Sequence, residues 1–372
     1  MDPQTVFCHN PACPARGQVG KGNIGVHSQK DRRYICHVCN TTFAASKGTA
    51  FYRLRKSKEL VVIVITLLAH GCPVQAIVAA FGLDERTVIS WNERAGRHCE
   101  QVHQHLVQKP RDLGQVQGDE IRVKIQGAIV WMAMAIQVST RLWLGGEVST
   151  SRDTALITAL MQKVRACALC RPLLFCMDGC QAYIGAIRTV FREAIRTGKR
   201  GRPRLRPWDG ILMAQVVKQY ARKRVIDVQR RVVQGTAAQV QALVQHTQGG
   251  GTINTAYIER LNATFRARIF ALVRRGRALA RQMPTLHTSM YLVGTVYNFC
   301  TDHSSLRVAI SLPGGRRWWV SRTPAIAAGL TDHRWTVEEL LSFRVPLPRW
   351  TPPKRRGRPS KVTKALVERW CT

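Results

Sequence analysis

Four cysteines near the start of the chain have the spacing of a metal site. Cys8 and Cys13 enclose four residues, Cys36 and Cys39 enclose two, and a 22-residue insert separates the pairs. Each pair can aim two sulfurs at one ion, and four thiolates complete the tetrahedral shell of a structural zinc site. In a chain of this length the pattern indicates metal binding rather than a disulfide scaffold. We therefore predict a zinc ribbon over residues 1–50.

Three carboxylates further along the chain could hold a second kind of metal. Asp119 precedes an alternating apolar pattern that predicts a strand, and Asp178 directly follows a short apolar run, residues 173–177. Acidic residues just past a buried strand line the clefts of open sheets. Glu259 lies on a predicted helix, residues 254–268, and shares one helical face with two polar residues, Asn262 and Arg266.

Such a set of acids suits phosphodiester cleavage and strand transfer. These reactions need charge stabilisation at the attacking and the leaving oxygen, which two Mg²⁺ ions about 3.5–4 Å apart can supply. Carboxylates on rigid elements can hold both ions and leave positions open for phosphate and water. The alternatives are Glu120 for Asp119, and Asp209 or Asp227 for another assigned acid. Because side chains alternate along a strand, we expect only one of Asp119 and Glu120 to enter the site.

The elements that must position these acids are both helices and strands. Strands are predicted at residues 118–126, 129–138 and 142–148, and their short connections favour an antiparallel meander. A predicted helix at 154–164 then leads to the strand at 173–177. We therefore expect a multidomain α+β chain with its acids at the ends of strands and on a helix.

Another group of predicted helices precedes the strands. Ser57 can cap a helix through residue 69, Pro73 suits the first turn of a second helix, and Asp84 can cap a third over residues 85–95. A short helix, a glycine-containing turn and another helix are the parts of a DNA-binding helix-turn-helix. The third helix would present four polar side chains to the major groove: Arg86, Thr87, Ser90 and Arg94.

The charge of the chain points to a polyanionic partner. Lys and Arg number 57 against 22 Asp and Glu, a net charge of +35 that argues against an ordinary metabolic enzyme and for nucleic acid. Between residues 188 and 281, basic residues number 21 and acidic residues four. No apolar run reaches the roughly 18 residues of a spanning helix, and no secretory leader is visible. We expect a cytoplasmic protein that has no membrane partner.

Two copies of Arg-Gly-Arg-Pro stand out within the basic segments and resemble the AT-hook core. An extended Arg-Gly-Arg can lie in a narrow A·T-rich minor groove, where the electrostatic potential is most negative. We therefore predict minor-groove contacts from both copies: Arg200 and Arg202 in the first, Arg356 and Arg358 in the second.

Two longer motifs resemble those of a known family. They are Tyr-x-Cys-x-x-Cys-x-x-x-Phe-x-x-x-x-Gly-Thr at residues 34–49 and Ile-Glu-Arg-x-Asn-x-Thr-x-Arg within residues 257–268. With the predicted ribbon and helix-turn-helix, they resemble bacterial insertion-sequence transposases of the DDE type. The zinc-ribbon group that includes the insertion-sequence-one family is the most similar, and the resemblance covers residues 1–345.

The resemblance implies a fold, an activity and partners. The implied fold is a ribonuclease-H-like mixed sheet flanked by helices. The implied activity is DNA cleavage and strand transfer at the terminal inverted repeats of a mobile element, carried by Asp119, Asp178 and Glu259 with Mg²⁺ or Mn²⁺. Two element ends must be joined, so we expect a homodimer or higher oligomer on DNA in the bacterial nucleoid. The alternative is a non-catalytic zinc-ribbon regulator or a domesticated transposase, which does not need the three acids.

The spacing of the acids departs from the family pattern. Asp178 and Glu259 are 81 residues apart, more than a compact sheet core requires. We therefore expect a basic insertion at about 197–250, in which residues 208–247 are predicted to be helical. The expected domains are the ribbon and four further ranges: helix-turn-helix 56–100, catalytic domain 112–300, C-terminal extension 301–345 and basic tail 346–372.

Overall fold

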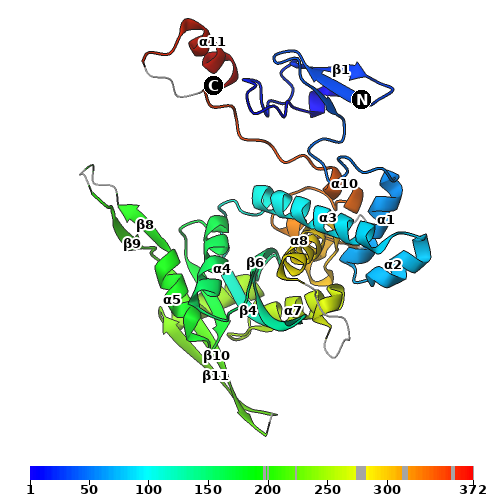
Figure 1. Ribbon diagram of the computed structural model, residues 1–372. Coiled ribbons are helices and arrows are strands. Elements are labelled where there is room, and N and C mark those ends of the chain that lie inside the picture. Colours follow the sequence, from blue (N-terminus) through cyan, green and yellow to red (C-terminus); the bar gives the residue numbers. More distant parts are fainter. Residues whose placement is uncertain are drawn as a thin grey trace. The chain divides into compact units, whose positions relative to one another are not determined.

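The computed structural model describes residues 1–195, 198, 201–222, 224–273, 282–311, 317–352 and 357–371 (Figure 1). The chain divides into two compact units. The first comprises Met1–Ser57 and Ser342–Thr372, and the second comprises Lys58–Leu341. The five expected domain ranges remain a proposal within these two units. Among the described residues, no helix combines the length and apolar character that crossing a membrane requires.

The first unit is a small sheet joined by a helix from the end of the chain. The strands β1 (Ile24–Ser28), β2 (Arg33–Cys36) and β3 (Thr42–Ala44) pair antiparallel in that order, after a short 3-10 helix, η1 (Pro3–Thr5). The helix α11 (Lys361–Trp370) buries Trp370 in the same apolar cluster as Tyr34 and Phe43. This cluster has nine buried members among the described residues, and three of them are N-terminal cysteines.

The second unit begins with the three predicted helices. They are α1 (Lys58–Ala69), α2 (Val74–Phe81) and α3 (Glu85–Leu106). The Asp84 side chain accepts a hydrogen bond from the Thr87 N–H, as a helix N-cap does. The predicted end of α3 near Ala95 is wrong, because the helix continues against α8 (Met283–Cys300). Gly96 permits this packing, since a Cβ there would lie 2.3 Å from the Thr288 carbonyl oxygen.

A six-stranded mixed sheet forms the centre of the second unit. The predicted meander is confirmed by β4 (Gln115–Ile125), β5 (Ala128–Gln137) and β6 (Trp143–Ser149), which pair antiparallel. The strand β7 (Leu173–Asp178) runs parallel to β4 on its other side. The sheet order is β11-β10-β7-β4-β5-β6, and β10 (Ile211–Ala221) is parallel to β7.

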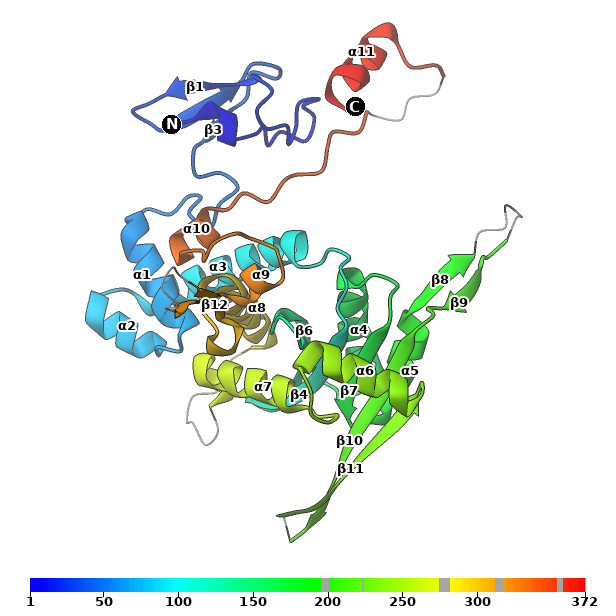
Figure 2. The same ribbon diagram turned by 180° about the vertical axis from the view of Figure 1, so that it is seen from behind.

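Helices cover both faces of this sheet (Figures 1 and 2). On one face lie α4 (Thr154–Cys167) and α5 (Gln181–Val190), and on the other lie α6 (Ala237–Gln248) and α7 (Ala256–Arg268). On the face covered by α7, the sheet and the helices pack through apolar residues of β4, β5, α7 and α8. They include Ile121, Met132, Met134, Leu261, Phe265 and Tyr291. This packing fixes α7 against the strand that carries Asp119.

The predicted helical insertion is wrong over most of its length. Residues that we expected to be helical form β10 and its antiparallel partner β11 (Arg224–Gln234), and only α6 confirms the prediction. The β-branched residues of this segment fit a pleated surface, and pairing with β7 overrides the helix-forming Leu212, Met213 and Ala214. The strand β10 therefore belongs to the main sheet, and β8 (Arg192–Ile195) pairs with β9 (Arg204–Pro207) as a separate two-stranded sheet.

Short elements complete the second unit. The 3-10 helices η2 (Phe270–Leu272) and η3 (Ser304–Leu306) follow α7 and α8. A two-stranded hairpin joins β12 (Val308–Ser311) to β13 (Arg317–Val320). Two short helices then end this part of the chain: α9 (Pro324–Ala327) and α10 (Val337–Ser342).

Candidate functional site

The structure brings the three predicted carboxylates together in one pocket. Asp119 comes from β4, Asp178 from the end of β7 and Glu259 from α7, and all three line a cavity of about 410 Å³. The cavity lies where the parallel strands β4 and β7 meet the first turns of α7. We call it the acidic pocket. Segments separated by up to 140 residues in sequence therefore converge on one volume that could accept a ligand.

Asp119 is held in a defined orientation. The Asn262 side chain donates a 2.7 Å hydrogen bond to Asp119 Oδ2, and the Glu120 N–H donates a 2.8 Å bond to Oδ1. Burial raises the pKa of Asp119 to about 6, and the nearby carboxylates of Glu120, Asp178 and Glu259 contribute to this rise. A cation in the pocket would relieve the repulsion, because it favours the charged carboxylate.

Glu120 reaches the same region from the opposite face of the strand. Its side chain is only 1% exposed, and Arg152 donates to its Oε2 through Nε at 3.0 Å and through Nη2 at 2.8 Å. Carboxylate oxygens of Asp119, Glu120 and Asp178 nevertheless lie within 4.8 Å of one another. Of Asp119 and Glu120, only Asp119 lines the acidic pocket, and the expectation that only one of the two enters the site stays a prediction.

Two basic side chains form ion pairs with the carboxylates. Arg152 Nη2 lies 3.5 Å from Asp178 Oδ2 as well as contacting Glu120. Lys218, on β10, places its Nζ 2.6 Å from Glu259 Oε1, and the Thr255 hydroxyl donates to the same oxygen at 2.9 Å. Both cations would compete with a metal ion for the acids.

The donor set fits a divalent cation with oxygen ligands. Asp119, Glu120 and Asp178 supply clustered carboxylate oxygens, and Asp178 and Glu259 are half-exposed, so that their oxygens remain accessible. Hard cations such as Mg²⁺ and Mn²⁺ prefer such ligands. The two alternative acids lie elsewhere: Asp209 precedes β10, Asp227 is exposed on β11, and neither lines the acidic pocket.

Replacing Asp119 by asparagine should change how stability depends on pH. Because the pKa of Asp119 in the folded protein is about 6 rather than its usual 3.8, the folded state binds the proton more tightly than the unfolded state. The resulting stabilisation is complete below the unfolded pKa and is lost as the pH rises through the folded pKa. Relative to wild type, the free energy of unfolding of Asp119→Asn should therefore rise by up to about 3 kcal/mol between about pH 4 and about pH 7.

Urea unfolding in EDTA at both pH values measures this difference. Asp227→Asn is the matched control, because it removes an exposed carboxylate outside the acidic pocket. A stability difference for Asp119→Asn that is equal at the two pH values would contradict the electrostatic description of the pocket.

The four N-terminal cysteines also come together. The sulfurs of Cys8 and Cys39 are 3.6 Å apart and those of Cys13 and Cys36 are 3.8 Å apart, and all four lie within 4.8 Å of one another. A tetrahedral zinc ion with bonds of about 2.3 Å would separate its sulfur ligands by roughly 3.8 Å. Burial raises the pKa of Cys8 and Cys13, so these thiols need a cation beside them to ionise. The cluster fits a bound metal ion in number, distance and ligand type.

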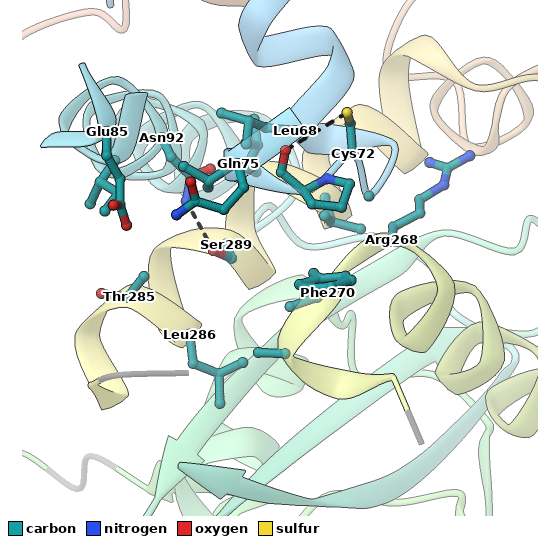
Figure 3. Close-up of a pocket in the computed structure, with 18 residues that line it drawn as sticks. Leu68, Cys72, Gln75, Glu85, Asn92, Arg268, Phe270, Thr285, Leu286 and Ser289 are labelled. Atoms are coloured by element: carbon teal, nitrogen blue, oxygen red, sulfur yellow. Dashed lines mark hydrogen bonds between the residues drawn. The ribbon is translucent and has the colours of Figure 1, made fainter. Parts of the chain in front are cut away.

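The predicted DNA-reading residues lie along the first half of α3. Arg86 and Ser90 are exposed, and Thr87 and Arg94 are half-buried. Ile89 and Asn92 turn instead toward a pocket of about 300 Å³ between α2, α3, η2 and α8 (Figure 3), where the Asn92 side chain donates to Ser289 Oγ at 3.1 Å. None of the assigned carboxylates lines this mostly apolar pocket. The α3 residues that line it mark the side of the helix that faces α2, η2 and α8.

The remaining predicted contacts are spread over other segments. Asn262 is buried against Asp119, and Arg266 is half-buried one turn further along α7. Arg202 and Arg358 are exposed in the two Arg-Gly-Arg-Pro copies. Their neighbours Arg200 and Arg356 lie outside the described residues.

Several pocket residues were not predicted from the sequence. Arg152 precedes α4, Lys218 lies on β10 and Thr255 precedes α7. An arginine and a lysine among 57 basic residues carry no local signal. Only the pairing of β10 with β7 could have indicated that Lys218 reaches Glu259.

Comparisons with known proteins add little to this geometry. No family model and no curated protein matches the sequence. Among solved structures, the chain is similar to one in the cryo-EM structure of the simian T-cell lymphotropic virus intasome in complex with PP2A regulatory subunit B56 gamma. The identity is 11%, the TM-score is 0.27, and the match covers 81% of this chain and 79% of that chain. At that TM-score, the likeness carries no argument about this protein.

Proposed function

We propose that this protein is a metal-dependent DNA endonuclease and strand transferase, a DDE transposase that acts on the ends of its own mobile element. The observation that carries the proposal is the convergence of Asp119, Asp178 and Glu259 on one pocket. A basic chain with a net charge of +35 suits a DNA substrate, both as terminal repeats and as target.

Each part of the pocket has a role in this proposal. Asp119, Asp178 and Glu259 would hold the divalent ions, and Asn262 orients Asp119 through its hydrogen bond. When bound, such ions supply charge stabilisation to the oxygens that exchange at phosphorus. Arg152 and Lys218 balance the charge of the acids until ions enter. Arg266, on the same helix as Glu259, would contact a phosphate of the DNA.

The remaining parts would bind and position DNA. We assign a ribonuclease-H-like fold to the mixed sheet with helices on both faces. We assign a helix-turn-helix to α1–α3, which would contact DNA bases through Arg86, Thr87, Ser90 and Arg94. The four cysteines would hold a structural zinc ion. The Arg-Gly-Arg-Pro copies would contact the minor groove, and joining two element ends requires at least a dimer on the DNA.

One observation favours a second candidate, a DNA-binding regulator that does not cleave. The carboxylates are ion-paired to Arg152 and Lys218, as they would be in a purely structural network. The cavity of about 410 Å³ weighs against that reading, because acids that only stabilise the fold need no open volume between them.

Asp178→Asn separates the two candidates. The substitution keeps the size of the side chain but removes the negative charge from the end of β7. Cleavage of DNA should be abolished, and DNA affinity should stay within about twofold of wild type, since most of the affinity comes from basic residues elsewhere. Cleavage by the variant at the wild-type rate would refute the assignment.

A further inference from the structure

A second polar pocket lies on α7, next to but distinct from the acidic pocket. It has a volume of about 500 Å³ and is lined by Arg260 and Arg268 of α7, Arg141 of the β5–β6 turn, and His303 after α8. Figure 2 shows α7 on this side of the sheet. We call it the arginine pocket. None of the three assigned carboxylates lines it.

The positive charge of the arginine pocket is not balanced within the described part of the chain. Asp302 is the one acid among the described residues that line it, and its Oδ2 already accepts a 2.9 Å hydrogen bond from Arg334. None of the three guanidinium groups forms an ion pair with a described acid. Converging cations without counter-charges destabilise a fold unless an anion joins them.

The side chain of Arg141 has a buried donor without a hydrogen-bond acceptor in the described part of the chain, which is the clearest indication of a ligand. Its Nη1 is buried and has no hydrogen-bond partner among the described residues, while its guanidinium lies 4.0 Å from the centre of the Tyr257 ring. Both guanidinium groups are partly buried, and this burial lowers the pKa of Arg141 and of Arg268. A buried donor without a partner costs free energy that a ligand could recover.

The backbone holds Arg141 in place. Its φ of 59° lies in the left-handed region, which residues other than glycine seldom adopt, and its carbonyl accepts a 3.1 Å hydrogen bond from the Tyr297 hydroxyl. Strain of this kind persists where the surrounding structure over-determines it, often at binding sites. The backbone is therefore fixed at Arg141, and stacking on the Tyr257 ring positions the guanidinium before any ligand arrives.

Hydroxyl groups complete the lining. Thr264, Thr301, Ser304 and Ser305 border the cavity, and the Thr301 hydroxyl accepts a 3.2 Å hydrogen bond from Arg268. The Thr264 and Thr301 hydroxyls already donate to the carbonyl oxygens of Arg260 and Val296, so the guanidinium forks are the donors that suit the several oxygens of a phosphate group. Arg260 is exposed as well as lining the pocket, so its guanidinium is accessible to a ligand.

We propose that the arginine pocket binds a phosphate group, either of a DNA backbone or of a free nucleotide or pyrophosphate. Arg260 directly follows Glu259, so one helix, α7, contributes to both pockets. The inference goes beyond the proposed function, because phosphate binding here requires neither the carboxylates nor cleavage.

The test uses the full chain in EDTA, so that no cleavage can occur. Arginine-selective modification by phenylglyoxal, read by mass spectrometry, reports on Arg260 with and without pyrophosphate or a short duplex. Binding of the labelled duplex is then measured against salt for wild type, Arg260→Gln and Arg260→Lys. Arg122→Gln is the matched control, since Arg122 is exposed on β4 and alternates with Ile121 and Val123, whose side chains face α7.

The expected result is that ligand protects Arg260 and not Arg122. With the DNA backbone as the source, Arg260→Gln should lower the slope of log affinity against log salt by about one and Arg122→Gln should not. Arg260→Lys should keep the slope but lose affinity, because lysine lacks the guanidinium fork. Protection by pyrophosphate with unchanged duplex binding would identify a free phosphate ligand.

Two results would overturn the proposal. The first is modification of Arg260 that neither pyrophosphate nor duplex slows. The second is equal protection of Arg260 and Arg122, which would indicate general screening of charge. Either result leaves the transposase proposal intact, and loss of cleavage in a carboxylate variant leaves this proposal intact.

Discussion

Replacing Glu259 by glutamine should reduce DNA cleavage by at least about 100-fold. Loss of a residue that merely supports a metal ligand typically costs about 10–100-fold, and a direct ligand should cost no less. The glutamine side chain has the same length and could still accept the hydrogen bond from Thr255, so the fold of α7 should persist. The charge is lost, and with it the ion pair to Lys218. Cleavage of labelled DNA and circular dichroism measure the two effects.

Two further acids serve as controls for Glu259→Gln. Asp209→Asn and Asp227→Asn each remove a carboxylate outside the acidic pocket, and both should cleave at close to the wild-type rate. A fully active Glu259→Gln together with an inactive Asp209→Asn or Asp227→Asn would contradict the assignment and move the third acid to that position.

Replacing Cys36 by serine should release the metal from the first unit and unfold it. Cys36 is fully buried, 3.8 Å from the sulfur of Cys13, and a hydroxyl is a poor ligand for zinc. Structural zinc binding contributes roughly 10–16 kcal/mol in small zinc domains, more than the small apolar cluster around Tyr34 and Phe43 can replace. Metal content should fall from one zinc per chain to none, and residues 1–57 should become sensitive to protease.

Cys170→Ser is the matched control, because Cys170 is exposed and outside the four-cysteine cluster. It should retain full metal content and protease resistance. Full retention of zinc by Cys36→Ser would refute the four-cysteine site.

The local signals in the sequence predicted the core of the fold well. Alternating residues around Ile121, the apolar run of β5 and the turn before β6 are each short-range patterns, and the meander they predict is confirmed. The cap at Asp84 and the paired cysteines are also local. Where a few adjacent residues decide the structure, the sequence could be interpreted directly.

The wrong predictions concern segments whose structure is determined by contacts with distant parts of the chain. Leu212, Met213 and Ala214 favour a helix locally, but hydrogen bonding to β7 makes them a strand. The predicted end of α3 is too early, because the second half of the helix packs against α8, and the hydrogen bond from Thr295 to the Cys99 carbonyl oxygen spans 196 residues. Arg152 and Lys218 entered no prediction for the same reason, since only the folded sheet brings them to the carboxylates.

The most direct test of the central claim is cleavage of end-labelled linear DNA that carries the ends of the mobile element encoding this chain. Wild-type protein is compared in Mg²⁺ and in EDTA, beside Asp178→Asn. The proposal predicts nicks at the element ends in Mg²⁺, and none in EDTA or with the variant. Tight binding without nicking by the wild type in Mg²⁺ would contradict the proposal and favour the regulator.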